Sequence, residues 1–534
     1  MPNRNKKKFK LHATKCVRDS SIKQTHQSIM RNFYLLLAFS VLSPMVNAQI
    51  RAKVVDVESK EPIPYANVVV NNSESLISNA EGYFTISDAN SSDDAKIVIS
   101  CMGYVGKQLT VGGLKSKDLV VALDFANYEL DNVNLADRPT AASIMAAVKQ
   151  NLKSNYALNT NLAKDVLFLR ETTLFKPSKL NIEITKSTGF SKQSLKEANA
   201  EIGKFTSNIV SHPPKQFNDV LGNYYTSPKK DDKTTNYYSK LDVVQATKLQ
   251  DESRSASLDE MQASATKMFL KHLDTTKYYR IKSGWFGSND TLSLRKDFNK
   301  KKKAKPVNTN VTQAKTRFSS VKTETNFLYS QKLEFVTQAE IYKYTYEGSV
   351  VLSDGSYAYV LKFEPRKSRA LYRGKIYVSD SDFAVLRADY ELVPGKKVEG
   401  VNLKLLLGVK MAENVGSGTV IYKKDPLGDG YYLQYASQTT GQYVYLNRPI
   451  KFIELTDEDK DVVAFDLKIE GDMLDKREFV NMSRTEVSEG GFADVKEDDF
   501  AYKKIKKYDP SLWTKYGSIE PLEEMKRFQV EEAN

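Results

Sequence analysis

The chain has 534 residues, of which 41% are hydrophobic, 10% aromatic and 27% charged. This composition is ordinary for a folded protein and excludes a collagen-like or intrinsically disordered chain. The net charge of +13 would suggest a nucleic-acid partner, but residues 1–48 hold nine Lys and Arg against one acidic residue and supply most of it. We therefore expect no nucleic-acid partner.

The first element predicted along the chain is a signal peptide at residues 30–48. An arginine precedes the mostly apolar stretch Phe33–Leu42, and Val46-Asn47-Ala48 places small residues at the cleavage site. The stretch is shorter than the ~20 residues that span a bilayer. Residues 1–29 are then a basic leader, unless Met30 is the true start. We expect export to the periplasm or the periplasmic face of the outer membrane.

Residues 49–124 alternate apolar and polar residues at period two, with turn residues between the runs. This pattern predicts an antiparallel β-sandwich. Its six expected strands are Ile50–Asp56, Ala66–Val70, Tyr83–Ile86, Ala95–Ser100, Lys107–Val111 and Leu119–Leu123.

Four ordered elements of this sandwich carry a resemblance. They are the first strand, Asp56 with Glu61–Val68, Ser78–Phe84, and Cys101–Tyr104. In this order they resemble the carboxypeptidase-regulatory-like domain of Bacteroidetes envelope proteins, which implies a transthyretin (prealbumin)-like sandwich joined to a larger, uncharacterised β-rich domain. Gly82 suits a turn that needs positive φ. One departure is Ala52, where the family usually has glycine.

The resemblance does not imply peptidase activity, because the family's domain is an accessory sandwich. A metallocarboxypeptidase needs zinc ligands of the type His-x-x-Glu with a distant His. After the predicted leader, only His212 and His272 remain, and they are followed by Pro-Pro-Lys and Leu-Asp-Thr. We expect no zinc site, no other metal and no cofactor.

Residues 125–160 are predicted to be a linker followed by a helix. Residues Ala141–Leu152 have helical spacing, and Thr140 is placed as the N-cap. Residues 161–315 form a mixed region with a helix-like stretch near 258–273 and a basic loop at 296–305. We interpret the basic loop 296–305 first as a solvated loop. The alternative is a loop that contacts anionic lipid or lipopolysaccharide.

Residues 316–490 predict a long antiparallel β-meander. Its pattern of strands resembles the curved sheets of periplasmic lipoprotein carriers. The expected strands are Glu340–Leu352, Tyr357–Glu364, Arg373–Ser379, Ala384–Leu392, Asn402–Met411, Gly418–Lys424, Tyr431–Thr439, Gln442–Leu446 and Val462–Ile469. We expect the charged tail 491–534 to pack along this domain and then fray.

No catalytic motif is found. Nucleophile elbows and phosphate loops are absent, and Cys101 is expected to be a buried structural thiol, the one cysteine left beyond the leader. The closely spaced acids are expected to cap turns instead of acting as catalysts or calcium ligands. They are the pairs Asp380 and Asp382, and Asp425 and Asp429, with the cluster Asp88, Asp93 and Asp94.

These observations favour a non-enzymatic envelope protein that binds a glycan, an amphiphile or an outer-membrane partner, or helps to assemble one. Mixed aromatic and basic runs such as Tyr342–Tyr346 and Lys367–Arg373 suit glycan or headgroup contacts, although they equally suit an ordinary exposed sheet face. The alternative is a carboxylate-dependent hydrolase of cell-surface polysaccharide. Contact with a membrane surface is compatible with the first interpretation.

Overall fold

The computed structural model describes residues 50–528, apart from gaps at 73, 127–138, 158–160, 188–190, 231–234, 251–277, 284–285, 294–308, 353–354, 456–461, 514–515 and 517–519. The predicted leader and signal peptide, the helix-like stretch 258–273 and the basic loop 296–305 lie outside the described residues. No described helix is long and apolar enough to cross a bilayer.

The N-terminal sandwich is confirmed, with all six predicted strands present and one further strand. One sheet has the order β4-β1-β7 and the other β3-β2-β5-β6. Inward-facing residues of both sheets form one core, which includes Val54, Val68 and Ile99. The strands are β1 (Ile50–Asp56), β2 (Asn67–Val70), β3 (Glu74–Ile77), β4 (Tyr83–Ile86), β5 (Lys96–Ser100), β6 (Lys107–Thr110) and β7 (Val120–Leu123).

The expectation of a purely antiparallel sandwich is wrong for one pair, because β7 runs parallel to β1. The physical reason is the short helix α2 (Val111–Lys115), which begins at the N-cap Thr110 and was not predicted. This helix carries the chain from the edge strand β6 of one sheet across to the other sheet, so that β7 arrives beside β1 in the same direction. A short 3-10 turn, η1 (Asp88–Asn90), connects β4 to β5.

The predicted helix in the linker is confirmed as α3 (Ala141–Tyr156). Thr140 caps it as expected, since its side chain accepts a hydrogen bond from the N–H of Ser143 at 3.1 Å. The apolar stripe of the helix, Ile144, Val148 and Leu152, is buried against the large sheet.

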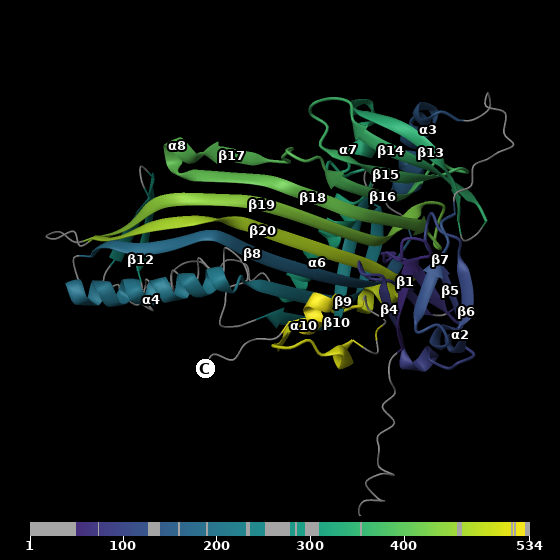
Figure 1. The fold of residues 1–534 in the computed structure, drawn as a ribbon, viewed down its shortest axis with the longest axis horizontal. Helices are drawn as coiled ribbons and strands as arrows, with labels where there is room; N and C mark the ends of the chain where they lie inside the picture. The colour runs from purple at the N-terminus through teal and green to yellow at the C-terminus, as the bar shows by residue number, and fades with distance from the viewer. Residues whose placement is uncertain are drawn as a thin grey trace, which may run out of the picture. The chain divides into compact units, whose positions relative to one another are not determined.

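The rest of the described chain builds one sheet of fourteen strands, with the order β13-β14-β15-β16-β18-β19-β20-β8-β9-β10-β21 and with β11, β12 and β17 off this path (Figure 1). The predicted antiparallel meander is confirmed in β13 to β20. The strands are β8 (Ala163–Ser187), β9 (Lys215–Lys230), β10 (Thr235–Gln250), β11 (Tyr278–Ser283), β12 (Phe286–Ser293), β13 (Tyr342–Val351), β14 (Tyr357–Pro365), β15 (Tyr372–Ser379), β16 (Val385–Leu392), β17 (Gly400–Leu403), β18 (Val409–Lys424), β19 (Tyr431–Glu454), β20 (Val462–Glu486) and β21 (Lys503–Ile505).

The boundary predicted between residues 161–315 and 316–490 does not divide this sheet. Strand β8 pairs with β20 along almost its whole length, from Ala163 opposite Glu486 to Ser187 opposite Val463. This pairing satisfies more than twenty backbone positions of a long strand that would otherwise be an exposed edge. The two predicted regions are therefore one folded unit.

Several predicted strands are fragments of longer ones. The predicted strands Tyr431–Thr439 and Gln442–Leu446 are parts of one strand, since Gly441 lies inside β19, opposite Leu474. A Cβ at Gly441 would lie 2.7 Å from the side chains of Leu474 and Val415, so this glycine permits close packing and not a turn. Conversely, the predicted strand Asn402–Met411 is interrupted by a helical turn, α8 (Lys404–Leu407), that ends at Gly408 with φ +64°.

Helices cover the sheet and were only partly predicted. Strand β8 carries α4 on one face, and α6 packs near β10 over the central core. The predicted packing of the tail is confirmed, since Trp513, Leu522 and Met525 are buried. The remaining elements are α4 (Lys192–Ser211), α6 (Asn310–Glu324), α7 (Glu334–Thr337), η3 (Ala339–Ile341), α9 (Glu489–Asp494), η4 (Pro510–Leu512) and α10 (Glu523–Arg527).

Candidate functional site

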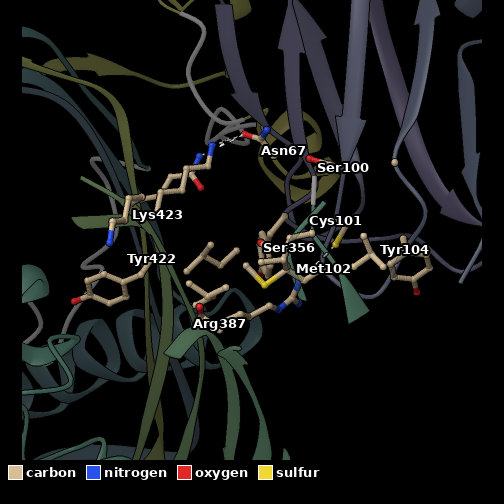
Figure 2. A pocket seen from close by; sticks show the side chains of 18 of the residues that line it. Asn67, Ser100, Cys101, Met102, Tyr104, Ser356, Arg387, Tyr422 and Lys423 are labelled. Carbon is tan, nitrogen blue, oxygen red and sulfur yellow. Dashed lines mark hydrogen bonds between the residues drawn. The ribbon is translucent and has the colours of Figure 1, made fainter. Parts of the chain in front are cut away.

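A cavity of about 500 Å³ lies where the sandwich meets the large sheet (Figure 2). The sandwich contributes the loop before β2 and the turn after β5, and the sheet contributes β16, β18 and β19. Its volume falls within the range of small-ligand sites. Among the lining residues are Tyr65, Asn67, Cys101, Met102, Tyr104, Leu386, Arg387, Ile421, Lys423 and Gln434.

Lys423 brings a charge into this cavity. It is half-buried, and its Nζ donates to the side-chain oxygen of Asn67 at 3.0 Å. No carboxylate of the described residues lies within ion-pair distance of it. Burial lowers the pKa of Lys423 from 10.5 to about 8. The amine is therefore still mostly charged at neutral pH, with a neutral amide oxygen as its partner.

Arg387 is the second cation at the cavity, but its charge is already balanced. Its side chain is 11% exposed, and its Nε donates to Asp389 at 2.8 Å. Its Nη1 also lies 3.5 Å from the sulfur of Cys101. Burial raises the pKa of the Cys101 thiol and Arg387 only partly opposes it, so the thiol is not activated. Cys101 is half-buried at the cavity wall, less enclosed than predicted.

One acid lies at the rim. Asp382 accepts a hydrogen bond from Tyr431 at 2.9 Å and faces the amine of Lys424 at 3.4 Å. Burial tends to raise the pKa of Asp382, but hydrogen bonds from Ser379, Tyr431 and the N–H of Ala384, together with Lys424, outweigh it and hold the pKa below its usual value. Asp382 is thus an ionised group with its own partners.

The other walls combine apolar and hydroxyl groups. Met102, Leu386 and Ile421 are apolar, and Ser100, Ser356, Ser379 and Ser381 offer hydroxyls. An apolar wall with a few polar groups and one poorly balanced cation suits a small molecule that has an apolar part and an anionic group.

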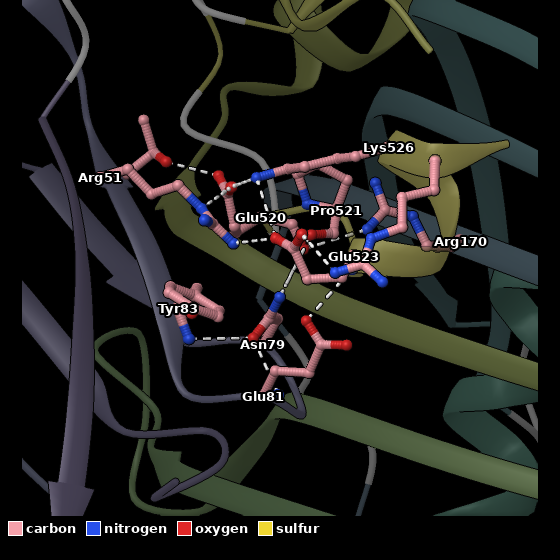
Figure 3. A network of polar contacts seen from close by, with 11 residues as sticks. Arg51, Asn79, Glu81, Tyr83, Arg170, Glu520, Pro521, Glu523 and Lys526 are labelled. Atoms are coloured by element: carbon pink, nitrogen blue, oxygen red, sulfur yellow. Dashed lines mark hydrogen bonds and ion pairs between the residues drawn. The ribbon is translucent and has the colours of Figure 1, made fainter. Parts of the chain in front are cut away.

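A polar network closes the same interface at another point, around Glu520 (Figure 3). Arg51 of β1 donates to Glu520 at 2.7 Å and to Glu523 at 2.5 Å. Arg170 of β8 donates to the backbone oxygen of Glu520 at 3.3 Å. The segment 520–528 therefore contacts the sandwich and the sheet together, and we call it the C-terminal clasp.

Of the elements that carry the family resemblance, the three segments 61–68, 78–84 and 101–104 all lie at this interface. From the first, Asn67 contacts Lys423, and the ring of Tyr65 lies 4.4 Å from that of Tyr435. From the second, Asn79 donates to the backbone oxygen of Pro521 at 3.3 Å. The third supplies Cys101 at the cavity wall. These three segments therefore form the surface by which the sandwich contacts the large sheet and the C-terminal clasp.

The acids singled out from the sequence do not gather into one site. The predicted turn contacts are present for Asp382, which accepts from Ala384 N–H, and for Asp425, which accepts from Leu427 N–H at 2.9 Å. Asp425 also pairs with Arg484, which in turn holds Asp165 at 2.8 Å. No group of three or more metal-ligating side chains occurs among the described residues.

The remaining predicted residues lie apart from the cavity. Asp93 pairs with Lys115 at 2.6 Å on the sandwich surface, and His212 ends α4. His272 lies outside the described residues. Tyr342 and Tyr344 are buried or half-buried in the sheet core instead of forming an exposed aromatic face. The segment 367–373 covers the turn before β15 and the first two residues of that strand, with Arg369 near Glu340 and Arg373 near Glu391.

Sequence reasoning missed Lys423, the central residue of the cavity. It lies in β18, in the part covered by the predicted strand Gly418–Lys424, and nothing in the linear pattern distinguishes it from other strand lysines. Its partner Asn67 lies within the segment that carries the family resemblance, and that was the one available signal.

Comparison with known proteins agrees with the N-terminal assignment. Residues 50–135 match the CarboxypepD_reg-like domain family, and a β-rich region follows this domain. No curated protein matches the chain.

Two solved structures show a distant similarity. A Bacteroides fragilis NCTC 9343 protein of unknown function, described as membrane-associated, is 9% identical, with 81% of this chain and 98% of that chain covered and a TM-score of 0.11. An outer membrane channel from Pseudomonas putida F1 is 9% identical, with 61% and 97% covered and a TM-score of 0.12. Scores this low support no inference about this chain.

Proposed function

We propose that this chain is a non-enzymatic binding protein of the bacterial envelope, and that it holds a small anionic amphiphile in the cavity between the sandwich and the sheet. One observation carries the proposal: Lys423 is held in that cavity by a neutral amide and by no described carboxylate. Keeping a lysine charged in such surroundings costs free energy, and an anionic ligand would recover it.

The surrounding groups support the same ligand class. Met102, Leu386 and Ile421 would contact the apolar part, and the serine hydroxyls would add hydrogen bonds. Arg387 would contribute little extra charge because Asp389 already balances it. The predicted signal peptide and the family of the sandwich support an exported protein, in the periplasm or at the periplasmic face of the outer membrane.

The alternative, a carboxylate hydrolase of polysaccharide, is less well supported. Asp165 and Asp425 are close together through Arg484, in a second cavity of about 280 Å³. A glycosidase needs one carboxylic acid whose pKa is raised so that it can donate a proton. Burial tends to raise the pKa of Asp165, but Lys322 and Arg484 outweigh it and hold the pKa low. Turnover in a panel of glycans would reinstate this alternative.

Binding of dodecanoate to residues 49–534 tests the proposal, with dodecanol as the neutral ligand of equal chain length. We expect calorimetry to show tighter binding of dodecanoate, and Lys423→Met to weaken it by about tenfold or more, the effect of losing one charge-assisted hydrogen bond. Affinity should also fall as the pH rises through about 8, because the amine then loses its charge.

The matched control is Lys362→Met, which removes a half-exposed lysine from β14, outside the cavity. It should bind dodecanoate as the unchanged protein does. The proposal would be contradicted if dodecanoate and dodecanol bound equally well, or if Lys423→Met and Lys362→Met lost the same affinity for dodecanoate.

A further inference from the structure

The turn that joins β17 to β18 exposes large apolar side chains. Leu405 and Leu406 of α8 are 101% and 77% exposed. Val401 and Met411, which face each other across β17 and β18, are 52% and 46% exposed. Such a concentration of exposed apolar side chains in one hairpin marks an interaction surface.

The turn is rigidly built. Gly408 adopts φ +64° and its N–H donates to Lys404 O at 3.1 Å, which ends α8. The N–H of Asn447 in β19 donates to Gly408 O at 2.7 Å, and a Cβ at Gly408 would lie 2.0 Å from the backbone oxygen of Asn447. The backbone is thus fixed against the neighbouring strand, and the exposure of the leucines is a property of the fold.

The exposed residues continue an apolar face that is covered elsewhere. In register across the sheet lie Leu403, Val409, Leu446, Ile469 and Leu180. Residues in register point to the same face, and at Leu180 that face packs against Ala198 and Ile202 of α4. The helix covers the β8 side of the face, while the β17 side and the α8 turn are left open.

Basic side chains lie next to this open edge. Lys410 lies opposite Tyr445 and projects from the other face, with its Nζ 5.1 Å from the ring of Tyr443, and the Nζ of Lys404 lies 4.1 Å from the ring of Tyr445. The adjoining segments 400–411 and 443–451 contain four basic residues and no acidic one. Apolar side chains beside lysines and tyrosines are the composition of a surface that contacts anionic lipid.

The exposure of Leu405 favours a bilayer over a folded partner. A side chain that is fully exposed has no neighbouring wall, so a protein partner would have to supply an entire pocket. A lipid surface encloses such a side chain without a matching shape.

We propose that the α8 turn, residues 401–411, is a membrane-contact site that inserts Leu405 and Leu406 into an anionic lipid surface while Lys404 and Lys410 contact the headgroups. The site lies far from the cavity: Val409 and Lys423 are fourteen positions apart in β18, roughly 45 Å of extended strand. Figure 1 shows α8 and β17 at the end of the long strands away from the sandwich. The inference is independent of the proposed ligand.

Sedimentation of residues 49–534, the form left after removal of the predicted signal peptide, with vesicles tests the site. One vesicle contains phosphatidylcholine and phosphatidylglycerol in equal parts, and the other phosphatidylcholine alone. We expect binding to the anionic vesicle, and a loss of about tenfold or more in Leu405→Ser/Leu406→Ser, as removal of two inserted leucines implies. Val120→Ser, which removes an apolar side chain 38% exposed on β7, is the matched control.

The second variant, Lys404→Gln/Lys410→Gln, should weaken binding to the anionic vesicle and leave little salt dependence. Equal binding by the leucine variant and Val120→Ser would overturn the site. A concentration-dependent dimer that the leucine variant abolishes, without vesicle binding, would also overturn it, in favour of a second copy as the occupant. Dodecanoate binding in the cavity should be unchanged in all these variants, which separates this test from that of the proposed function.

Discussion

Arg170 and Asp219 form an ion pair from which solvent is almost excluded. Their side chains are 1% and 2% exposed, and two hydrogen bonds of 2.9 and 2.7 Å join them. Burial tends to lower the pKa of Arg170, but Asp219 more than offsets it, so the pKa lies above its usual value. Arg170 also donates to Glu520, so one residue supports both the β8–β9 pair and the C-terminal clasp.

Replacing Arg170 by Met should lower the free energy of unfolding by about 3–5 kcal/mol, because it leaves the carboxylate of Asp219 buried without its partner. Urea unfolding measures the loss. The comparison is Arg373→Met, which breaks the exposed pair with Glu391 and should cost about 1 kcal/mol or less. Similar losses in both variants would mean that Asp219 finds another partner.

At this scale the sequence predicts local contacts better than distant ones. The cap at Thr140 and the turn contacts of Asp382 and Asp425 depend on residues two or three positions away, and these predictions are confirmed. The partners of Lys423 and Arg170 come from other strands. No local pattern could have predicted them.

Glycines within strands set how closely neighbouring elements approach. Gly374 in β15 lies opposite Tyr390 in β16, and a Cβ there would lie 2.0 Å from the backbone oxygen of Asp389. Gly203 in α4, by contrast, has nothing within 4 Å of the position of its Cβ. Replacing the glycine by alanine should therefore have opposite effects on the free energy of unfolding at the two positions.

Gly374→Ala should lower the free energy of unfolding by about 1–3 kcal/mol, since β15 and β16 must move apart to admit the methyl group. Gly203→Ala should raise it by up to about 1 kcal/mol, because alanine favours the helix over the unfolded chain. Chemical denaturation of the two variants side by side checks both signs. If Gly374→Ala were neutral, the two strands would have room to adjust.

Helices and strands were predictable where the period of the apolar residues and the length of the segment indicated the same structure. Short sandwich strands and the hairpins β13 to β16 follow the alternation of the sequence closely. The long strands β18 and β19 are longer than the predicted fragments, because in a sheet this wide a glycine can lie inside a strand. For β20 the prediction covers only the first part, Val462–Ile469, of a strand that continues to Glu486. The helices α4 and α6 are rich in Ser, Thr, Asn and Lys, so their apolar stripes are weak in the sequence.

For the molecule as a whole, the docking of the sandwich is the feature that depends most on distant residues. Its partners come from β16, β18 and β19 and from the clasp, which lie between 286 and 441 positions away along the chain in the contacts of Cys101, Asn67 and Asn79. The family resemblance located the segments of the sandwich that take part, but not what they contact. The cavity exists only because these two surfaces meet, which is why the sequence did not predict it.

The clasp should couple the unfolding of the two parts. Glu520 and Glu523 both bind Arg51 of the sandwich, while Glu524 binds Lys215 of β9 and does not reach the sandwich. We expect calorimetry of residues 49–534 to show one main transition, and Glu520→Ala/Glu523→Ala to split off a transition of the sandwich at lower temperature. Glu524→Ala breaks a contact of the same segment with the sheet alone, so it should leave a single transition. If the double variant showed no split, the apolar contacts around Tyr65 and Tyr435 would hold the sandwich in place without the clasp. A split in Glu524→Ala would contradict the assignment of the coupling to the contacts of Glu520 and Glu523 with Arg51.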